Sequence, residues 1–247
     1  MPEGDSLHRA AERLRVLEGE IVQAESPHPR AALLGIAERI HGKRLERVEA
    51  RGKNLLLTFE DGLVVRSHLR MRGRWFVQPA GRPILGSPWL VLRTPDWQAV
   101  QRNGPILELG TLKLARLGPD VMVEPPDFQE MLKRFRATDQ ARELGDALLD
   151  QRMVAGIGNK WKAEALFEAS LSPWLRLRDV SDDCLLEVLS AASRLMKEGR
   201  RGNRAYRRAG RPCTRCGARI VSRPQGENAR MAYWCPSCQA GTEAAGA

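Results

Sequence analysis

Two pairs of cysteines, Cys213-Thr-Arg-Cys216 and Cys235-Pro-Ser-Cys238, stand near the end of this chain with eighteen residues between them. Each pair can place two thiolates on one metal ion, and four thiolates suit a closed tetrahedral zinc site. The intervening residues alternate weakly around Pro224-Gln-Gly-Glu227, which predicts a hairpin. Two disulfides in a secreted protein are the alternative, but no signal peptide is evident and the only other cysteine is Cys184. We therefore predict one structural zinc ion at Cys213, Cys216, Cys235 and Cys238.

Composition bounds the class of protein. A length of 247 residues allows one large domain or two modest ones, and no apolar run approaches the length of a membrane span. The net charge of +10 and the pI near 9.9 favour a polyanionic partner. Residues 197–212 hold seven lysines and arginines against one acid, Glu198. Because this run directly precedes the cysteines, it favours nucleic-acid phosphate over a solvated basic linker.

Local patterns predict a β-rich first half followed by helices. An amphipathic helix is expected over residues 4–18. Short β-type runs follow at 55–59, 63–65, 74–78, 89–93, 99–101 and 111–115, which suggests a sandwich or barrel. After a proline-rich connector at 117–126, helices are expected at 128–135, 141–149, 160–169 and 181–197, the last with Ser181 as its N-cap.

The N-terminus, Met1-Pro-Glu-Gly-Asp5, is the first place where chemistry could occur. Removal of Met1 would expose Pro2 as an α-amine, whose pKa of about 7.7–8 leaves a useful fraction unprotonated near neutral pH. A secondary amine that attacks an aldehyde-like carbon forms an iminium ion with no N–H to lose, which favours elimination at the neighbouring carbon. Glu3 could serve as acid or base. Taken alone, these residues are also those of an ordinary terminus.

Two further segments are suited to phosphate. Gly156-Ile-Gly-Asn-Lys160 lies between predicted helices, where glycines and a helix N-terminus let backbone N–H groups approach an anion. A tight interhelical turn is the alternative. The cysteine hairpin carries four arginines and could enter a groove, although solvated arginines on a purely structural hairpin would look the same. These arginines are Arg215, Arg219, Arg223 and Arg230.

In their order along one chain, these features resemble the formamidopyrimidine-DNA glycosylase and endonuclease VIII family. The resemblance runs from residue 2 to residue 239, and its opening and its Tyr-Trp-Cys-Pro ending are more similar to the endonuclease VIII branch. It includes Arg51-Gly-Lys-Asn-Leu-Leu-Leu57, Arg116-Leu-Gly-Pro-Asp120 and Leu148-Leu-Asp-Gln151.

The resemblance implies an α+β multi-domain fold. An N-terminal β-sandwich with flanking helices is expected at 1–116, and a linker at 117–128. A helix–two-turn–helix domain is expected at 129–212 and a zinc-ribbon hairpin finger at 213–239, with a disordered tail at 240–247.

The resemblance also implies catalytic roles. Pro2 would be the Schiff-base nucleophile at C1′ of the damaged nucleotide, and Glu3 the acid that helps to open the sugar ring. Lys53 would approach phosphates near the lesion and assist β-elimination. Arg230 would hold phosphate and assist δ-elimination.

Further DNA contacts are implied at His68, Arg70, Arg116 and Asn159. Met71 stands where the family places a side chain that fills the gap left by a flipped base, and flipping is needed because C1′ is not reachable within an intact stack. From the residues alone, Met71 could be a core methionine, His68 a surface donor and Lys53 a solvated charge. Arg70 and Arg72, which flank Met71, indicate an exposed loop instead.

Two departures from the family bear on substrate. Asp5-Ser6 stands where many members have Pro-Glu, so a secondary carboxylate is either missing or moved to Asp5. The stretch before Cys213 is short, whereas members that cap an oxidised purine use a longer loop there. Oxidised pyrimidines are therefore expected first.

Taken together, we expect a monomeric, cytoplasmic DNA glycosylase and AP lyase with one zinc ion. It would act on damaged double-stranded or single-stranded DNA by β,δ-elimination. The alternatives are an AP lyase with little glycosylase activity, and a non-catalytic zinc-dependent DNA-binding protein.

Overall fold

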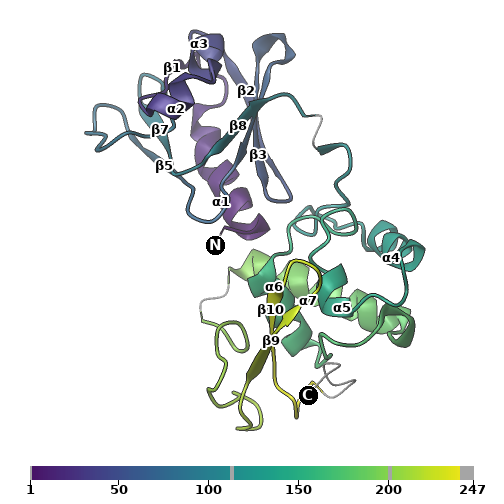
Figure 1. Cartoon of the computed structure of the whole chain (residues 1–247). Coiled ribbons are helices and arrows are strands. Elements are labelled where there is room, and N and C mark those ends of the chain that lie inside the picture. The colour runs from purple at the N-terminus through teal and green to yellow at the C-terminus, as the bar shows by residue number, and fades with distance from the viewer. Residues whose placement is uncertain (1, 112–113, 200–201, 240–247) are drawn as a thin grey trace. The chain divides into compact units, whose positions relative to one another are not determined.

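The computed structural model describes residues 2–111, 114–199 and 202–239, and the chain divides between Ala115 and Arg116 into two compact units (Figure 1). The expected tail at 240–247 lies outside the described residues. Within them, no helix combines the length and the apolar character that a membrane crossing requires.

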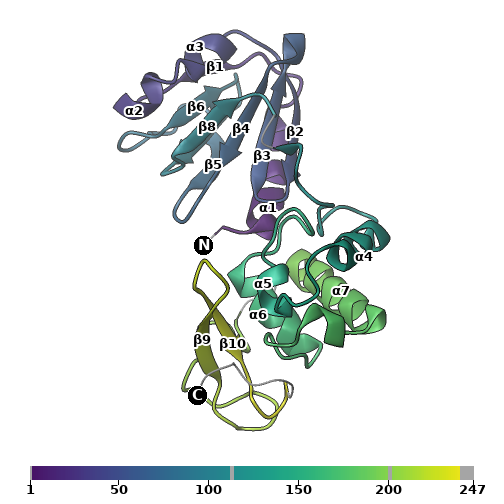
Figure 2. The same cartoon turned by 45° about the vertical axis from the view of Figure 1, so that its right-hand side comes forward.

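The first unit packs helix α1 (Gly4–Leu14), the short helix α3 (Ile36–Ile40) and two antiparallel sheets around a single core (Figure 2). Helix α1 buries Leu7 and Leu14 and leaves its polar face in solvent. One sheet has the order β2-β3-β4-β8, with strands Leu45–Arg51, Asn54–Phe59, Val64–His68 and Ile106–Leu109. The other has the order β1-β6-β7-β5, with strands Gln23–Glu25, Leu90–Arg93, Trp97–Arg102 and Arg74–Pro79. Apolar residues of both sheets share the core, which is the expected sandwich.

The second unit is helical up to its cysteine hairpin. Its helices are α4 (Phe128–Ala137), α5 (Leu144–Ala147), α6 (Asn159–Glu168) and α7 (Asp182–Glu198). The Ser181 hydroxyl accepts a hydrogen bond from the Cys184 N–H at 3.2 Å, so the predicted N-cap is confirmed. The hairpin consists of antiparallel β9 (Val221–Gln225) and β10 (Arg230–Trp234), and β10 packs against α6.

Buried polar contacts join the hairpin region to the helices. The Glu164 carboxylate of α6 accepts hydrogen bonds from the backbone N–H groups of Ala205 and Tyr206 at 3.0 and 2.8 Å. The Gln239 amide donates to the carbonyl of Leu171 at 2.8 Å. The segment that precedes the finger and the last described residue of the finger are therefore both fixed to the helical part.

The structure departs from the local predictions in several places. Strands β1, β2 and β8 and the short helices α2 (Pro29–Ala32) and α3 (Ile36–Ile40) were not expected. The strand predicted at 111–115 is wrong for the described residues Thr111, Leu114 and Ala115, while 112 and 113 lie outside the description. The edge strand is Ile106–Leu109, where Glu108 pairs with Arg66 and interrupts the apolar pattern. The predicted helix at 141–149 covers only α5.

Candidate functional site

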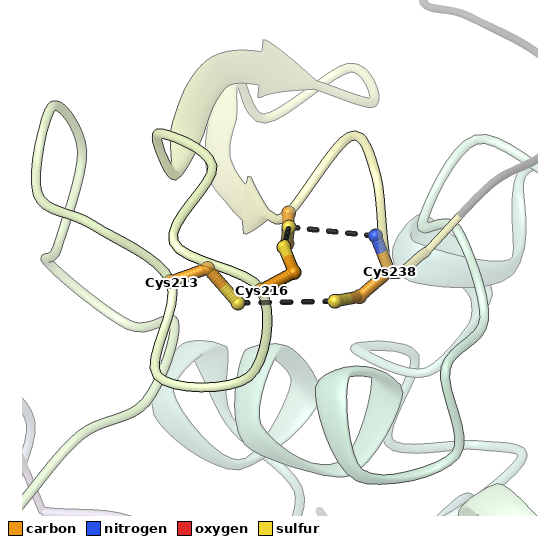
Figure 3. Close-up of side chains that lie close together, drawn as sticks. Cys213, Cys216 and Cys238 are labelled. Atoms are coloured by element: carbon orange, nitrogen blue, oxygen red, sulfur yellow. Dashed lines mark hydrogen bonds between the residues drawn. The ribbon is translucent and has the colours of Figure 1, made fainter.

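The four cysteines converge on one point of the second unit, as Figure 3 shows for three of them by label. Their sulfur atoms all lie within 4.8 Å of one another. The Sγ atoms of Cys213 and Cys238 are 3.9 Å apart, and those of Cys216 and Cys235 are 3.5 Å apart. A tetrahedron with metal–sulfur distances of about 2.3 Å requires sulfur–sulfur separations of roughly 3.8 Å. The cluster therefore fits one tetrahedral metal ion.

Hydrogen bonds within the knuckles also suit thiolate ligands. The backbone N–H of Arg215 donates to the sulfur of Cys213 at 3.3 Å, and the N–H of Cys238 donates to that of Cys235 at 3.4 Å. Hydrogen bonding with Cys216, together with burial, raises the pKa of Cys238 to about 12. Against burial, which would raise it, the backbone N–H groups of Arg215 and Cys216 lower the pKa of Cys213 to about 7. At neutral pH Cys238 would thus keep its proton until a bound divalent ion displaced it.

A cavity of about 700 Å³ opens beside Pro2 in the first unit. One wall is the face of α1 that carries Ser6, Ala10 and Arg13, spaced by four and three residues as neighbours on a helix must be. The cavity is also lined by Met71, by the exposed ring of Phe76 and by the arginines Arg72, Arg74 and Arg102. None of the described residues that line it carries a carboxylate.

At the start of α1, Asp5 and Ser6 occupy the positions where many family members have Pro-Glu. Asp5 is buried and pairs with Arg9 one turn further along the helix, whereas Ser6 lines the cavity. The carboxylate has therefore not moved into the cavity wall at Asp5. Glu3 is 2% exposed and stands at the N-cap position of α1, where its carbonyl accepts the Ser6 N–H at 2.9 Å.

Lys53 and His68 lie at the same end of the sheet β2-β3-β4-β8. Lys53 occupies the two-residue turn between β2 and β3, where Gly52 adopts a φ of +59° that an L side chain rarely adopts. His68 ends β4, and its Nδ1 accepts the Arg70 N–H at 3.0 Å. Burial, followed by the charges of Arg66, Arg70 and Lys53, lowers the pKa of His68 to about 4. A neutral imidazole in a strongly positive environment results.

The loop after β4 presents Met71 outward. Met71 is 57% exposed, so the core interpretation of this methionine is wrong. The preceding residue, Arg70, has a φ of +50°, and the Gly73 N–H donates to the Leu69 carbonyl at 2.8 Å. A Cβ added to Gly73 would lie 2.5 Å from that same oxygen. The loop thus depends on Gly73 for the tight bend that exposes Met71.

In the second unit, Asn159 and the strand of Arg230 come together. The Asn159 amide Nδ2 donates to the carbonyl of Met231 at 2.9 Å, and its Oδ1 is buried with no hydrogen-bond partner among the described residues. Arg230, next to Met231, is exposed at the start of β10. Arg116 is exposed and makes no hydrogen bond or ion pair with the described residues; nothing joins it to this pair.

Several residues of these sites escaped the sequence analysis. The helical spacing of Ser6, Ala10 and Arg13 could have pointed to one wall of the cavity, but Phe76 and Arg102 meet it only through the packing of the sheet. The buried pair Lys162 and Gln225 lies 63 residues apart in sequence and carried no local signal.

Comparison with known proteins identifies the chain's relatives. Sequence models of the formamidopyrimidine-DNA glycosylase N-terminal domain and H2TH domain match residues 1–103 and 117–207. A protein of Streptomyces coelicolor described as probable endonuclease 8 2 is 38% identical over 98% of this chain and 95% of its own length. The DNA-(apurinic or apyrimidinic site) lyase Nei2 of Mycolicibacterium smegmatis is 34% identical over 97% of this chain and 99% of its own length.

Solved structures agree on the fold. The formamidopyrimidine-DNA glycosylase of Lactococcus lactis, bound non-covalently to DNA with an AP site, superposes with a TM-score of 0.81 and 22% identity. The match covers 97% of this chain and all of that one, so the two proteins share their architecture. Together with the full-length relatives, this shows that the chain belongs to the formamidopyrimidine-DNA glycosylase and endonuclease VIII family, in its endonuclease VIII-like branch.

Proposed function

We propose that this protein is a DNA glycosylase and AP lyase that removes damaged bases with Pro2 as its nucleophile. The relatives support this activity, since one is described as a probable endonuclease 8 and another as a DNA-(apurinic or apyrimidinic site) lyase. The single observation that carries the proposal is the position of Pro2 in the wall of a cavity of about 700 Å³. A cavity of this size accommodates a small-molecule-sized ligand such as a nucleotide.

The chemistry follows from a secondary amine at C1′. The Pro2 nitrogen bonds to C1′ as the bond from C1′ to the damaged base breaks, and the base leaves with a proton. Glu3 delivers a proton to the ring oxygen O4′, which opens the sugar and leaves an iminium ion. Loss of a C2′ proton expels the 3′ phosphate, and a second elimination expels the 5′ phosphate. Water then hydrolyses the iminium and restores the Pro2 amine.

The other proposed site residues of the first unit contact the DNA around the lesion rather than the damaged base itself. Lys53 approaches the phosphate that leaves in the first elimination, and Arg70 adds charge beside it. His68, held neutral, donates its Nε2 hydrogen to a phosphate oxygen. Met71 enters the duplex at the place of the flipped nucleotide, for which its exposure suits it.

In the second unit, Asn159 and Arg230 bind phosphate together, and Arg116 adds a further contact. One Nδ2 hydrogen of Asn159 is donated to Met231, and its second hydrogen would serve a phosphate oxygen. Arg230 supplies the charge that stabilises the phosphate leaving in the second elimination. Zinc bound by the four cysteines would hold the hairpin in shape and supply no step of the reaction.

We infer oxidised pyrimidines as the preferred lesions. The stretch before Cys213 is too short to form the longer loop with which family members cap an oxidised purine. The absence of a carboxylate from the described wall beside Ser6 removes one group that would orient a particular base edge. Both features describe a pocket with few base-specific contacts.

Borohydride trapping tests the proposal. The protein is incubated with duplexes that carry either an oxidised pyrimidine or an abasic site, and reduction should fix a covalent adduct on both. An N-terminal extension that places the Pro2 nitrogen in a peptide bond should abolish the adduct, and its proteolytic removal should restore it. No adduct on either duplex would refute the enzyme and leave the DNA-binding alternative. An adduct on abasic DNA alone would indicate an AP lyase without glycosylase activity.

A further inference from the structure

Gln225 and Arg230 face each other across the last rung of the finger hairpin. The register of β9 and β10 pairs them directly, and the turn that joins the strands begins with the next residue, Gly226. Gln225 is only 4% exposed, while Arg230 is exposed. The proposed phosphate-binding residue Arg230 is therefore paired with a buried residue, Gln225.

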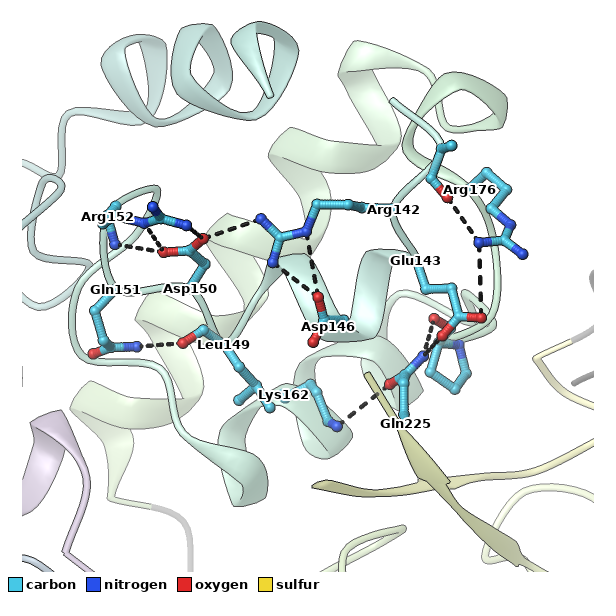
Figure 4. A network of polar contacts seen from close by, with 12 residues as sticks. Arg142, Glu143, Asp146, Leu149, Asp150, Gln151, Arg152, Lys162, Arg176 and Gln225 are labelled. Carbon is cyan, nitrogen blue, oxygen red and sulfur yellow. Dashed lines mark hydrogen bonds and ion pairs between the residues drawn. The ribbon is translucent and has the colours of Figure 1, made fainter. Parts of the chain in front are cut away.

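The Gln225 amide is held at both of its polar atoms by the helical part of the unit (Figure 4). Its Nε2 donates to the Glu143 carboxylate at 3.0 Å and to the Pro173 carbonyl at 2.8 Å. Its Oε1 accepts from the ammonium group of Lys162, which is 0% exposed, at 3.5 Å. An amide with donors and acceptors matched on both sides has one favourable orientation.

Close packing around Gln225 and the adjacent Gly226 also fixes the position of this end of the hairpin. A Cβ added to Gly226 would lie 2.1 Å from the carboxylate of Asp146, and one added to Gly145 would lie 2.3 Å from Oε1 of Gln225. Asp146 is itself fixed by Arg142, which donates to it at 2.8 Å. On the other strand, Asn159 donates to the carbonyl of Met231.

The metal cluster alone would leave this end of the hairpin loosely defined. Cys235 follows Trp234, so the cysteines lie at the far end of the strands. Gln225 lies four positions after Val221 along β9, which corresponds to roughly 13 Å of extended chain. A two-stranded hairpin is marginally stable by itself, so its free end needs its own anchor.

We propose that Gln225 is a positioning residue for Arg230, which sets how well this arginine serves the second elimination. This rests on the proposed function, because it takes Arg230 to bind the phosphate that leaves last. Loss of the amide contacts would release the rung, and a displacement of about 1 Å can lower the rate of a step by about a hundredfold. The step at Pro2 would be affected less.

The products made from an abasic duplex test this. Full elimination leaves a 3′ phosphate, whereas arrest after the first elimination leaves a 3′ unsaturated aldehyde, and a gel separates them. Gln225→Ala should lower the ratio of the first product to the second by about tenfold or more, with the Pro2 adduct and one metal ion per chain retained. Ser222→Ala, on the same strand, is the matched control and should leave the ratio unchanged.

A double variant separates positioning from a general loss of structure. If Gln225 acts through Arg230, adding Gln225→Ala to Arg230→Gln should change the ratio no further. Gln225→Glu should also lower the ratio, because its carboxylate would face the Glu143 carboxylate and the Pro173 carbonyl and could donate to neither. An additive double variant would overturn the proposal.

Hydrogen exchange gives a measure that does not depend on the reaction. The amides of residues 225–231 should exchange faster in Gln225→Ala than in the Ser222→Ala control. Unchanged exchange would overturn the positioning role by itself. If exchange rises but Arg230→Gln leaves the products unaltered, the assigned role of Arg230 fails, and with it the link from Gln225 to elimination.

Discussion

Arg66 donates a hydrogen bond to the side-chain oxygen of Asn54 at 2.6 Å and thereby connects the strand that ends at His68 with the turn that carries Lys53. A second guanidinium nitrogen, Nη2, donates to the Glu108 carboxylate at 2.7 Å. The Asn54 amide closes the turn by donating to the Arg51 carbonyl at 3.2 Å. A buried arginine thus fixes two of the proposed DNA-binding residues relative to each other.

Arg66→Met should lower the free energy of unfolding by about 3 kcal/mol, because it removes from both Asn54 and Glu108 the hydrogen bond of a buried guanidinium group. Urea unfolding monitored by tryptophan fluorescence measures this. Arg47→Met, at an exposed arginine beside Glu49, is the control and should stay within about 0.5 kcal/mol. Equal effects of the two substitutions would contradict the assigned importance of the Arg66 bridge.

His68 should remain neutral down to nearly pH 4 in the free protein, since burial and then Arg66, Arg70 and Lys53 lower its pKa to about 4. Its folded-state pKa lies below the unfolded value of about 6.5, so protonation favours the unfolded chain. The stability associated with neutral His68 is therefore present above pH 6.5 and is lost as the pH falls toward 4. Imidazole proton resonances should show the midpoint, and His68→Gln should flatten the stability profile in this window.

Bound DNA should raise the pKa of His68. A phosphate placed against the imidazole favours its protonated form, so a titration in the presence of an abasic-site duplex should give a higher midpoint for His68. An unchanged midpoint for His68 would count against its contact with phosphate.

Met71→Ala should change stability by less than about 0.5 kcal/mol because the side chain is exposed. Excision from duplex DNA should nevertheless slow, since the flipped nucleotide leaves a gap that alanine cannot fill. Excision from a single-stranded oligonucleotide should change much less. Leu33→Ala, at an 87% exposed leucine of the same unit, is the control and should leave both rates alone. Equal slowing on the two substrates would contradict the gap-filling role.

Zinc removal should weaken DNA binding through the hairpin. Cys216→Ser should reduce the metal content below one ion per chain and should lower the slope of log affinity against log salt by about one, as loss of one phosphate contact would. Arg230→Gln should lower the slope by the same amount while retaining the metal. If the metal-free protein kept the full slope of log affinity against log salt, the cysteine cluster would have no part in DNA binding.

The sequence by itself determined the elements whose signal is local. The Cys-x-x-Cys spacing predicted that four thiols would meet, and the structure brings them within 4.8 Å of one another. Apolar residues at helical spacing predicted α1 and α7, and the predicted N-cap Ser181 accepts its hydrogen bond. These features depend on residues a few positions apart, or on a metal whose ligands come in recognisable pairs. The ordered motifs added the family and its α+β architecture.

Only the tertiary structure decided which of several similar residues act together. It placed Ser6 rather than Asp5 at the cavity, exposed Met71, and joined Lys162 to Gln225. Strand β8 escaped the sequence analysis because Glu108 turns toward Arg66, 42 residues away. The energy of such contacts comes from burial and from partners distant in sequence, so no local pattern encodes them. For this protein, residue spacing identifies the thiols and the N-terminal amine, and packing decides what surrounds each of them.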